Sequence, residues 1–384
     1  MHEDLLDFRH LDCQHTGKNL ARILYDILKD FNIQTRLYCI TTDNAGNNGT
    51  LVGELERLLK NDGISWDSSK HHIRCLAHIL NLTVKAFLNK LKIAAPSAEQ
   101  QFMDDSDDEN VSDEAKAERE VFNINAVNEF HRAIQKIRTI SKVINFPPSR
   151  LHAFQHFCDT ANVKRLRPIK DHQIRWNATF NMIHRALFLK AAIDTWTRSK
   201  VQYANLILTK REWELVAFLM HFLLPFKRAT DYLQFTKRLT LHKTYETYEN
   251  LFNSLENVKA QFALMAYKPD WISQVETAIQ AMWNKLQKYY TKSGTPPAFA
   301  DAIILHPSYK LKWFKRRNWD NDLVEEYKQR SRKRFEAEYN SPSIPIVPSK
   351  RQFHDSSDED EDFNEFDQFI GSKRHADVKC PLEW

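Results

Sequence analysis

Glycine, cysteine and long apolar runs are all scarce in this 384-residue sequence, and each scarcity argues against a class of protein. Seven glycines stand beside nine tryptophans and 24 phenylalanines, a balance that favours a helix-rich protein over a barrel or a sandwich. The five cysteines are odd in number and scattered, and neither a signal peptide nor a run of 18 apolar residues occurs. We therefore expect an intracellular protein in a reducing compartment, with no membrane partner.

Acidic residues are concentrated in two runs. Nine acidic and two basic residues lie between 103 and 120, and eight acidic residues with no basic one lie between 355 and 367. Outside these runs the net charge of the chain, +5 overall, becomes +20 over 353 residues. Such an excess suits a polyanionic partner, most commonly nucleic acid, although solvated Lys and Arg on helix faces account for part of it.

Apolar spacing divides the chain into segments of different character. Helix and strand patterns alternate over residues 1–94, which predicts parallel strands with crossover helices, as in an α/β core. Residues 95–122 and the tail 341–384 have few core-forming residues, so we predict both to be disordered. The remaining segments are a continuation of the core at 123–176, an all-α insertion at 177–295, and a return segment with a basic helix at 296–340. Within the insertion, long helices are expected at 210–235, 241–259 and 272–291.

Asp43 follows a short apolar stretch, 37–40, that has the character of a buried strand. The residues from Asp43 to Asn48 include no apolar side chain larger than alanine, so the chain leaves the sheet there. Ligands of open α/β sheets bind at the carboxyl ends of strands, and a hard cation in that position requires acidic oxygens. Asp43 is thus a candidate metal ligand. The alternative is an Asp that caps the next helix, expected at about 49–59.

Cys75 and His78 lie at the start of an apolar helix predicted at 76–91, where both could simply be packed. With His71 and His72 they imitate the ligands of a zinc site. Burial of a Cys-x-x-His pair within a helix argues against zinc, so we expect no zinc finger.

Two further motifs combine polar and apolar side chains. Arg175 and Trp176 lie at a strand-to-helix turn, where a simple stacked pair is one explanation. Residues 302–311 include His306 and Lys310 and could form a loop that fixes a hydrophobic plug.

A basic helix is predicted at 322–339. Its cations are Lys328, Arg330, Arg332, Lys333 and Arg334. They are candidate nucleic-acid contacts, and residues 330–334 also match a weak nuclear-localisation pattern. A solvated helix face is the alternative explanation.

Six blocks of sequence, in their order, resemble the hAT superfamily of DNA transposases (hobo, Activator, Tam3). The blocks are HTGKNLA at 15–21, TDNAGNN at 42–48, CLAHILNL at 75–82, RWNAT at 175–179, IILHPSYKL at 303–311 and PLEW at 381–384. The resemblance covers the chain from residue 15 to its last residue, apart from the acidic runs. It implies a partial RNase H-like catalytic fold interrupted by a large helical insertion domain, that is, α/β plus all-α.

The resemblance also implies roles for individual residues. The family uses a DDE triad that binds two divalent ions, Mg²⁺ or Mn²⁺, for cut-and-paste transposition through hairpin DNA ends. Asp43 matches the second Asp of that triad, and His78 matches a motif histidine near the active site. Trp176 matches the tryptophan that stacks on a flipped base, with Arg175 beside it, and stacking plus cationic contact suit a displaced base.

The departures from the family pattern shape the expected function. Too few residues precede the helix that begins near Gly17 to hold the opening strands, which carry the first Asp. The final Glu maps to no residue, so we expect a transposase truncated at both ends. Two-metal chemistry needs several carboxylates, and Asp43 alone cannot hold both ions. The chain is therefore expected to be a nuclear, transposase-like DNA-binding protein that is catalytically inactive alone.

Two alternatives remain open. One is a domesticated DNA- or protein-binding module. The other is an active metal-dependent nuclease completed by a partner chain. The expected partners are DNA and either further copies of this chain or a full-length transposase, with no small-molecule substrate.

Overall fold

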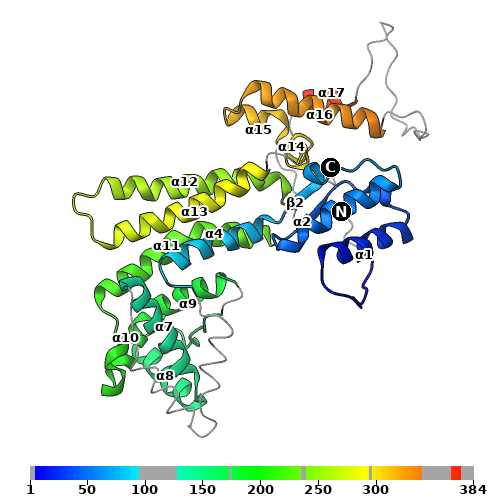
Figure 1. Cartoon of the computed structure of the whole chain (residues 1–384). Coiled ribbons are helices and arrows are strands. Elements are labelled where there is room, and N and C mark those ends of the chain that lie inside the picture. The colour runs from blue at the N-terminus through cyan, green and yellow to red at the C-terminus, as the bar shows by residue number, and fades with distance from the viewer. Residues whose placement is uncertain are drawn as a thin grey trace, which may run out of the picture. The chain divides into compact units, whose positions relative to one another are not determined.

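The computed structural model describes residues 5–94, 128–172, 175–234, 239–293, 296–339 and 365–372. Within these ranges the chain is mostly helical and forms one two-stranded sheet (Figure 1). It divides into two compact units. Unit 1 comprises Met1–Cys75, Thr236–Glu246 and Thr291–Trp384, and unit 2 comprises Leu76–Phe235 and Thr247–Tyr290.

Unit 1 begins with two helices that pack on each other. They are α1 (Gly17–Asp30) and α2 (Gly46–Asn61). Their shared core is the apolar cluster Ala21, Leu28, Leu51, Val52, Leu55, Leu59 and Trp66. A Cβ atom added to Gly17 would lie 2.4 Å from the carbonyl oxygen of Asn47. Glycine is thus required for the close approach of the two helices.

The sheet pairs β1 (Ile40–Thr42) with β2 (His72–Arg74) in parallel, Ile40 opposite His72. The strand predicted at 37–40 is therefore displaced, because the chain forms a 3₁₀ turn, η1 (Gln34–Arg36), just before it. The helix predicted at 49–59 is longer at both ends and is α2. A four-residue helix, α3 (Ser68–His71), leads into β2.

The C-terminal part of unit 1 is helical. Its elements are η3 (Leu241–Lys243), the start of α12 (Thr244–Ala263), α14 (Ala298–Ile304), α15 (Lys310–Arg316), α16 (Asn321–Tyr339) and α17 (Glu365–Gly371). The prediction of disorder over 341–384 was wrong for residues 365–371, which form α17. The helix is held there because Phe366 is buried and its ring centroid lies 6.0 Å from that of Phe335. The rest of 341–384, and all of the acidic insertion 95–122, lie outside the described residues.

Unit 2 is entirely helical in the part of it that the structure describes. Its elements are α4 (Leu76–Lys90), α7 (Glu129–Asn145), α8 (Pro148–Thr160), α9 (Asn177–Phe188), α10 (Lys190–Arg198), η2 (Val201–Leu206), α11 (Lys210–Leu233), most of α12, and α13 (Trp271–Ser293). The long helix α11 packs against α4, α7 and α9 (Figure 1).

This packing moves the predicted domain boundaries. Residues 76–94 and 123–176 were expected in the α/β core, yet their described parts pack with the helical insertion in unit 2. The reason is the apolar face of α4, on which Phe87 is fully buried and stacks on Phe222 of α11 with ring centroids 4.6 Å apart. In the described ranges, no helix is both long and apolar enough to cross a membrane.

Candidate functional site

Asp43 lies in unit 1, directly after β1, on an exposed turn. Its Oδ1 atom accepts hydrogen bonds from the Ala45 backbone N–H at 2.9 Å and from Asn48 Nδ2 at 2.6 Å. The N-cap position of α2 is occupied by Ala45, which makes no side-chain capping bond. Asp43 therefore does not cap α2, although a helix cap was the alternative to a metal ligand. Its carboxylate instead fixes the turn between the strand and the helix.

The residues around Asp43 do not fit a pair of divalent metal ions. Among the residues that the structure describes, no group of three or more His, Cys, Asp or Glu side chains is placed to hold a metal ion. A two-metal site requires several carboxylates at one place, and one oxygen of Asp43 already serves the turn. No catalytic step through Mg²⁺ or Mn²⁺ follows from this arrangement.

Two consecutive histidines, His71 at the end of α3 and His72 at the start of β2, serve packing. His72 lies opposite β1, and its Nε2 atom is 2.8 Å from Thr42 Oγ1. The His71 ring stacks on Trp66 with centroids 5.8 Å apart. Burial lowers the pKa of both histidines, so both rings are neutral at pH 7.

His78, Arg175 and Trp176 all belong to unit 2. His78 is half-buried on α4, and Arg175 is exposed just before α9. Trp176 is only 2% exposed and belongs to the apolar core, with its ring edge-on to Phe180. The buried indole of Trp176 cannot contact a nucleic-acid base in this position. Its predicted stacking role therefore requires the ring to leave the apolar core.

Asn81 is a residue of this site that the sequence reasoning missed. It lies on α4, one turn after His78, and its Oδ1 atom accepts a long hydrogen bond, 3.4 Å, from the Trp176 backbone N–H. Within unit 2, the contact joins residues of two resembling blocks, 75–82 and 175–179. Little in the sequence distinguishes Asn81, because α4 also carries other polar residues, such as Thr83, Lys85 and Asn89.

A buried ion pair joins Asp171 to α7, and Asp171 in turn bonds to α9. The Arg138 guanidinium donates to Asp171 at 2.8 Å and to the Ile93 carbonyl at 2.6 Å, and both charged side chains are largely buried. Asp171 also accepts from Thr179 Oγ1 at 2.9 Å. Because a broken buried pair is costly, these residues fix the position of the turn. Nothing local in the sequence indicates the pairing, since Arg138 and Asp171 are far apart along the chain.

The cations of the predicted basic helix, α16, are largely engaged within unit 1. Arg334 pairs with Asp301 and lies 4.7 Å from the centroid of the Tyr38 ring. Arg332 pairs with Glu336 at 2.8 Å and with Asp367 of α17 at 3.0 Å.

The other three cations of α16 differ in their surroundings. Arg330 lies 4.9 Å from the Tyr327 ring, and Lys328 is 3.4 Å from Glu325. Lys333 is exposed. Lys333 is therefore the member of the set that is best placed for the predicted contact with nucleic acid.

Two family models match the chain in consecutive stretches. The ZBED1 RNase-like domain matches residues 1–71, and the ZBED1 RNase-like helical domain matches residues 73–222. The junction between the two matches lies close to the division between unit 1 and unit 2 at residue 75. A putative AC transposase of Zea mays is 24% identical over 95% of this chain. This chain belongs to the hAT family of transposase-like proteins.

Other relatives of this hAT-family chain carry different names. A putative transcriptional regulator, tpeD, of Talaromyces stipitatus is 29% identical over 90% of the chain. The zinc finger BED domain-containing protein RICESLEEPER 2 of Oryza sativa subsp. japonica is 21% identical over 81% of it. The chain spans 37% of the length of the Talaromyces protein and 40% of the length of the Zea mays protein.

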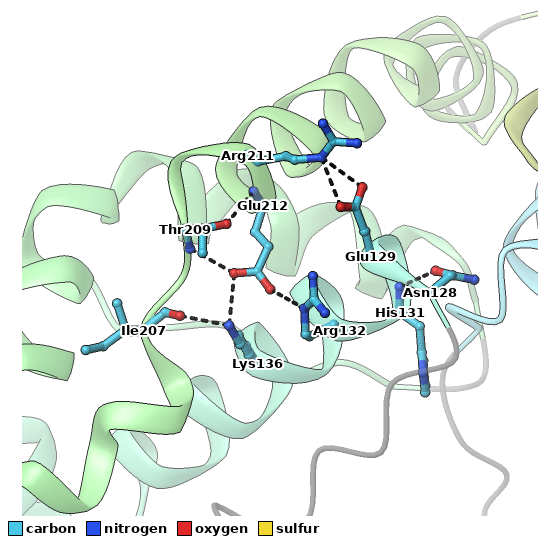
Figure 2. Close-up of polar contacts among 9 residues, drawn as sticks. All are labelled: Asn128, Glu129, His131, Arg132, Lys136, Ile207, Thr209, Arg211 and Glu212. Atoms are coloured by element: carbon cyan, nitrogen blue, oxygen red, sulfur yellow. Dashed lines mark hydrogen bonds and ion pairs between the residues drawn. The ribbon is translucent and has the colours of Figure 1, made fainter. Parts of the chain in front are cut away.

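The helical unit of this hAT-family chain holds a second buried charge cluster, around Glu212 (Figure 2). Glu212 accepts from Lys136 Nζ at 2.9 Å, from Arg132 Nε at 2.8 Å and from the Thr209 N–H at 2.8 Å. Burial raises the pKa of this carboxyl, but the three donors outweigh it and the pKa lies below its ordinary value. Because all three of these hydrogen-bond donors come from the fold itself, the carboxylate of Glu212 has a structural role. It closes the capping box that starts α11.

Proposed function

We propose that this chain is a transposase-derived, nuclear DNA-binding module that does not cut DNA by itself. The observation that carries the proposal is the setting of Asp43. In the described part of the chain this strand-end carboxylate stands apart from any cluster that could hold a metal. Hydrolysis by the two-metal route needs such a cluster.

The charge distribution supports DNA as the partner. Outside the two acidic runs the chain carries a net charge of +20 over 353 residues. Exposed cations in both units, such as Lys333 and Arg175, are free to meet phosphates without first breaking an ion pair that the structure records. Binding of this kind releases counterions and weakens steeply with salt.

The fold and the relatives support the same proposal. The ZBED1 RNase-like match over residues 1–71, together with the parallel β1–β2 pair and its connecting helix, supports a partial RNase H-like core in unit 1. One relative bears the name of a putative transcriptional regulator and others the name of a putative transposase. Nuclear residence follows from a DNA partner.

The test combines binding and cleavage by the purified chain. Hairpin and nicked terminal DNA substrates are incubated with Mg²⁺ or Mn²⁺, and binding is followed in parallel at several salt concentrations. We expect binding that falls as salt rises, and no metal-dependent cutting. Cutting that disappears in the Asp43→Ala variant would overturn the proposed inactivity, and affinity independent of salt would overturn the electrostatic basis of binding.

A mixing experiment addresses completion of the site by another chain. The purified protein is combined with a separately expressed full-length hAT transposase whose own cleavage is disabled at its second Asp. We expect no restored cutting. Restored cutting that requires Asp43 would favour the partner-completed nuclease instead.

A further inference from the structure

A cleft of about 390 Å³ lies within unit 1, between α15 and the segment where η3 passes into α12. Its lining includes Lys243, Glu246, Tyr309, Trp313, Arg316 and Arg317, and we name it the Lys243 cleft. Its volume falls within the usual range for small-ligand sites. None of its residues belongs to the Asp43 turn, the Trp176 turn or the basic helix.

The Lys243 cleft carries more positive than negative charge. Glu246 is the one carboxylate in its lining, and it is 2.8 Å from Lys243 Nζ and 3.8 Å from Arg317 Nη2. Arg316 adds a third cation and is exposed. A single carboxylate shared by two cations leaves the lining with an excess of positive charge, which favours an anion.

Aromatic rings line the same cleft. Lys243 Nζ lies 5.1 Å from the centroid of the Tyr309 ring, and the Arg317 guanidinium lies 4.3 Å from the Trp313 ring. Rings beside cations are the combination with which proteins bind single-stranded nucleic acid, because the cations meet the phosphates and the rings meet the bases.

A rigid stack supports Tyr309. The His306 ring lies 4.3 Å from Tyr309 and 4.5 Å from His242, centroid to centroid. His306 Nδ1 accepts the Ser308 backbone N–H at 3.2 Å, which fixes its tautomer. Burial lowers the pKa of His242 to about 4, with His306 and Lys243 contributing. Burial also lowers the pKa of His306. The neutral form of both rings is therefore favoured near pH 7, and the charge of the cleft comes from its lysine and arginines.

We propose that the Lys243 cleft binds single-stranded DNA, with a backbone phosphate among Lys243, Arg316 and Arg317 and an unpaired base against Tyr309. The proposal rests on DNA binding as the proposed function and assigns it to a specific place in unit 1. It also gives a role to the resembling block at 303–311, whose Tyr309 forms one wall.

The first test measures the affinity of the full chain for a fluorescent oligothymidylate of about 12 nucleotides, within the range of site sizes for single strands. Arg316→Glu is compared with Lys60→Glu, which makes the same charge change at an exposed position of α2. We expect Arg316→Glu to weaken binding roughly tenfold or more and to lower the slope of affinity against salt by about one, and Lys60→Glu to weaken it by about twofold or less.

The outcomes separate this inference from the proposed function. If the chain binds oligothymidylate and both variants weaken it equally, the Lys243 cleft is not the site, although DNA binding stands. If Arg316→Glu weakens binding to duplex DNA alone, the assignment to single strands is wrong. If the unaltered chain binds no DNA of any kind, both the cleft and the proposed function fail.

A second test addresses the ring. The chain is offered an abasic oligonucleotide of the same length, and the loss of affinity relative to oligothymidylate is measured for the unaltered protein and for Tyr309→Leu. We expect a loss of roughly fivefold or more for the unaltered protein and a much smaller one for the variant. Equal losses would overturn base contact at Tyr309. Circular dichroism and a melting curve establish that the variant is folded, and Tyr309→Phe, which keeps the ring, should behave as the unaltered protein.

Discussion

The two units differ in their apolar cores and in the setting of their exposed cations. Unit 2 surrounds α11 with one continuous apolar cluster and buries two clusters of paired charges, at Glu212 and at Arg138 with Asp171. Unit 1 has a smaller α1–α2 core and a sheet of two three-residue strands. Its cations lie partly exposed against tyrosine and tryptophan rings in the Lys243 cleft. Apolar packing around α11 is thus the main feature of unit 2, whereas unit 1 also places cations beside aromatic rings at its surface.

The largest expected effect tests the packing of unit 2. Phe87→Ala should lower the free energy of unfolding by about 4 kcal/mol, because it leaves a cavity beside Phe222. Urea denaturation followed by circular dichroism measures it. Phe188→Ala is the control, since that side chain is 48% exposed, and it should cost less than about 1 kcal/mol. Equal costs would show that the core of unit 2 does not dominate its stability.

The next effect concerns the buried charges of unit 2. Glu212→Ala should cost about 3 kcal/mol, because it leaves the buried Lys136 without its carboxylate and opens the capping box. Glu129→Ala removes a partly exposed partner of Arg211 nearby (Figure 2) and should cost less than about 1 kcal/mol. Thermal melts measure both variants. Equal losses of stability would show that the Glu212 cluster does not stabilise unit 2.

In unit 1, burial of His242 should make stability depend on pH. The pKa of His242 is about 4 in the folded protein and 6.5 when it is free of the fold. Between these values the unfolded chain binds the proton and the folded chain does not. Stability contributed by the neutral ring is thus complete above pH 6.5 and decreases as pH falls toward 4, by about 2 to 3 kcal/mol.

Hydrogen exchange of peptides from residues 239–246 and 296–316, followed from pH 7.5 to pH 4, measures this loss. The variant His242→Gln removes the titrating group, so its stability should change less over the same pH range. An unchanged pH dependence in that variant would show that another group is responsible.

The smallest expected effect probes the close approach of α1 to α2. Gly17→Ala should destabilise this pair by about 2 kcal/mol, because the added Cβ meets backbone atoms of α2 at 2.4 and 2.8 Å. Gly53→Ala is a matched control in α2 with nothing within 4 Å of the new atom, and it should stabilise by about 0.5 to 1 kcal/mol. Exchange protection in α1 is the measurement, and a neutral Gly17→Ala would contradict the packing.

Apolar spacing predicted the long helices well. The helices expected at 76–91, 210–235 and 272–291 are confirmed as α4, α11 and α13 within a few residues. Their apolar faces repeat over several turns, so the periodic signal is strong. The strand at 37–40 was wrong in position because the whole of β1 is three residues long and leaves little pattern to read.

The candidate site was predictable only in part. Local patterns identified Asp43, His78 and Trp176 as noteworthy, but burial of Trp176 depends on helices that lie far away in the sequence. Segments that are distant in the sequence also form the Arg138–Asp171 pair and the Lys243 cleft. Contacts between distant segments are set by tertiary packing, and a single sequence does not display them.

The buried ammonium group of Lys310 links α17 to the rest of unit 1. Only 2% of the residue is exposed, and its Nζ atom donates to the Phe369 carbonyl at 2.6 Å and to Ser372 at the end of α17. Asp367, also on α17, pairs with Arg332 of α16. Because α17 belongs to the same molecule, its local concentration is high and does not fall on dilution. Any external anion that is to reach Arg332 must therefore compete with this internal one, and its apparent affinity is lower than its intrinsic affinity.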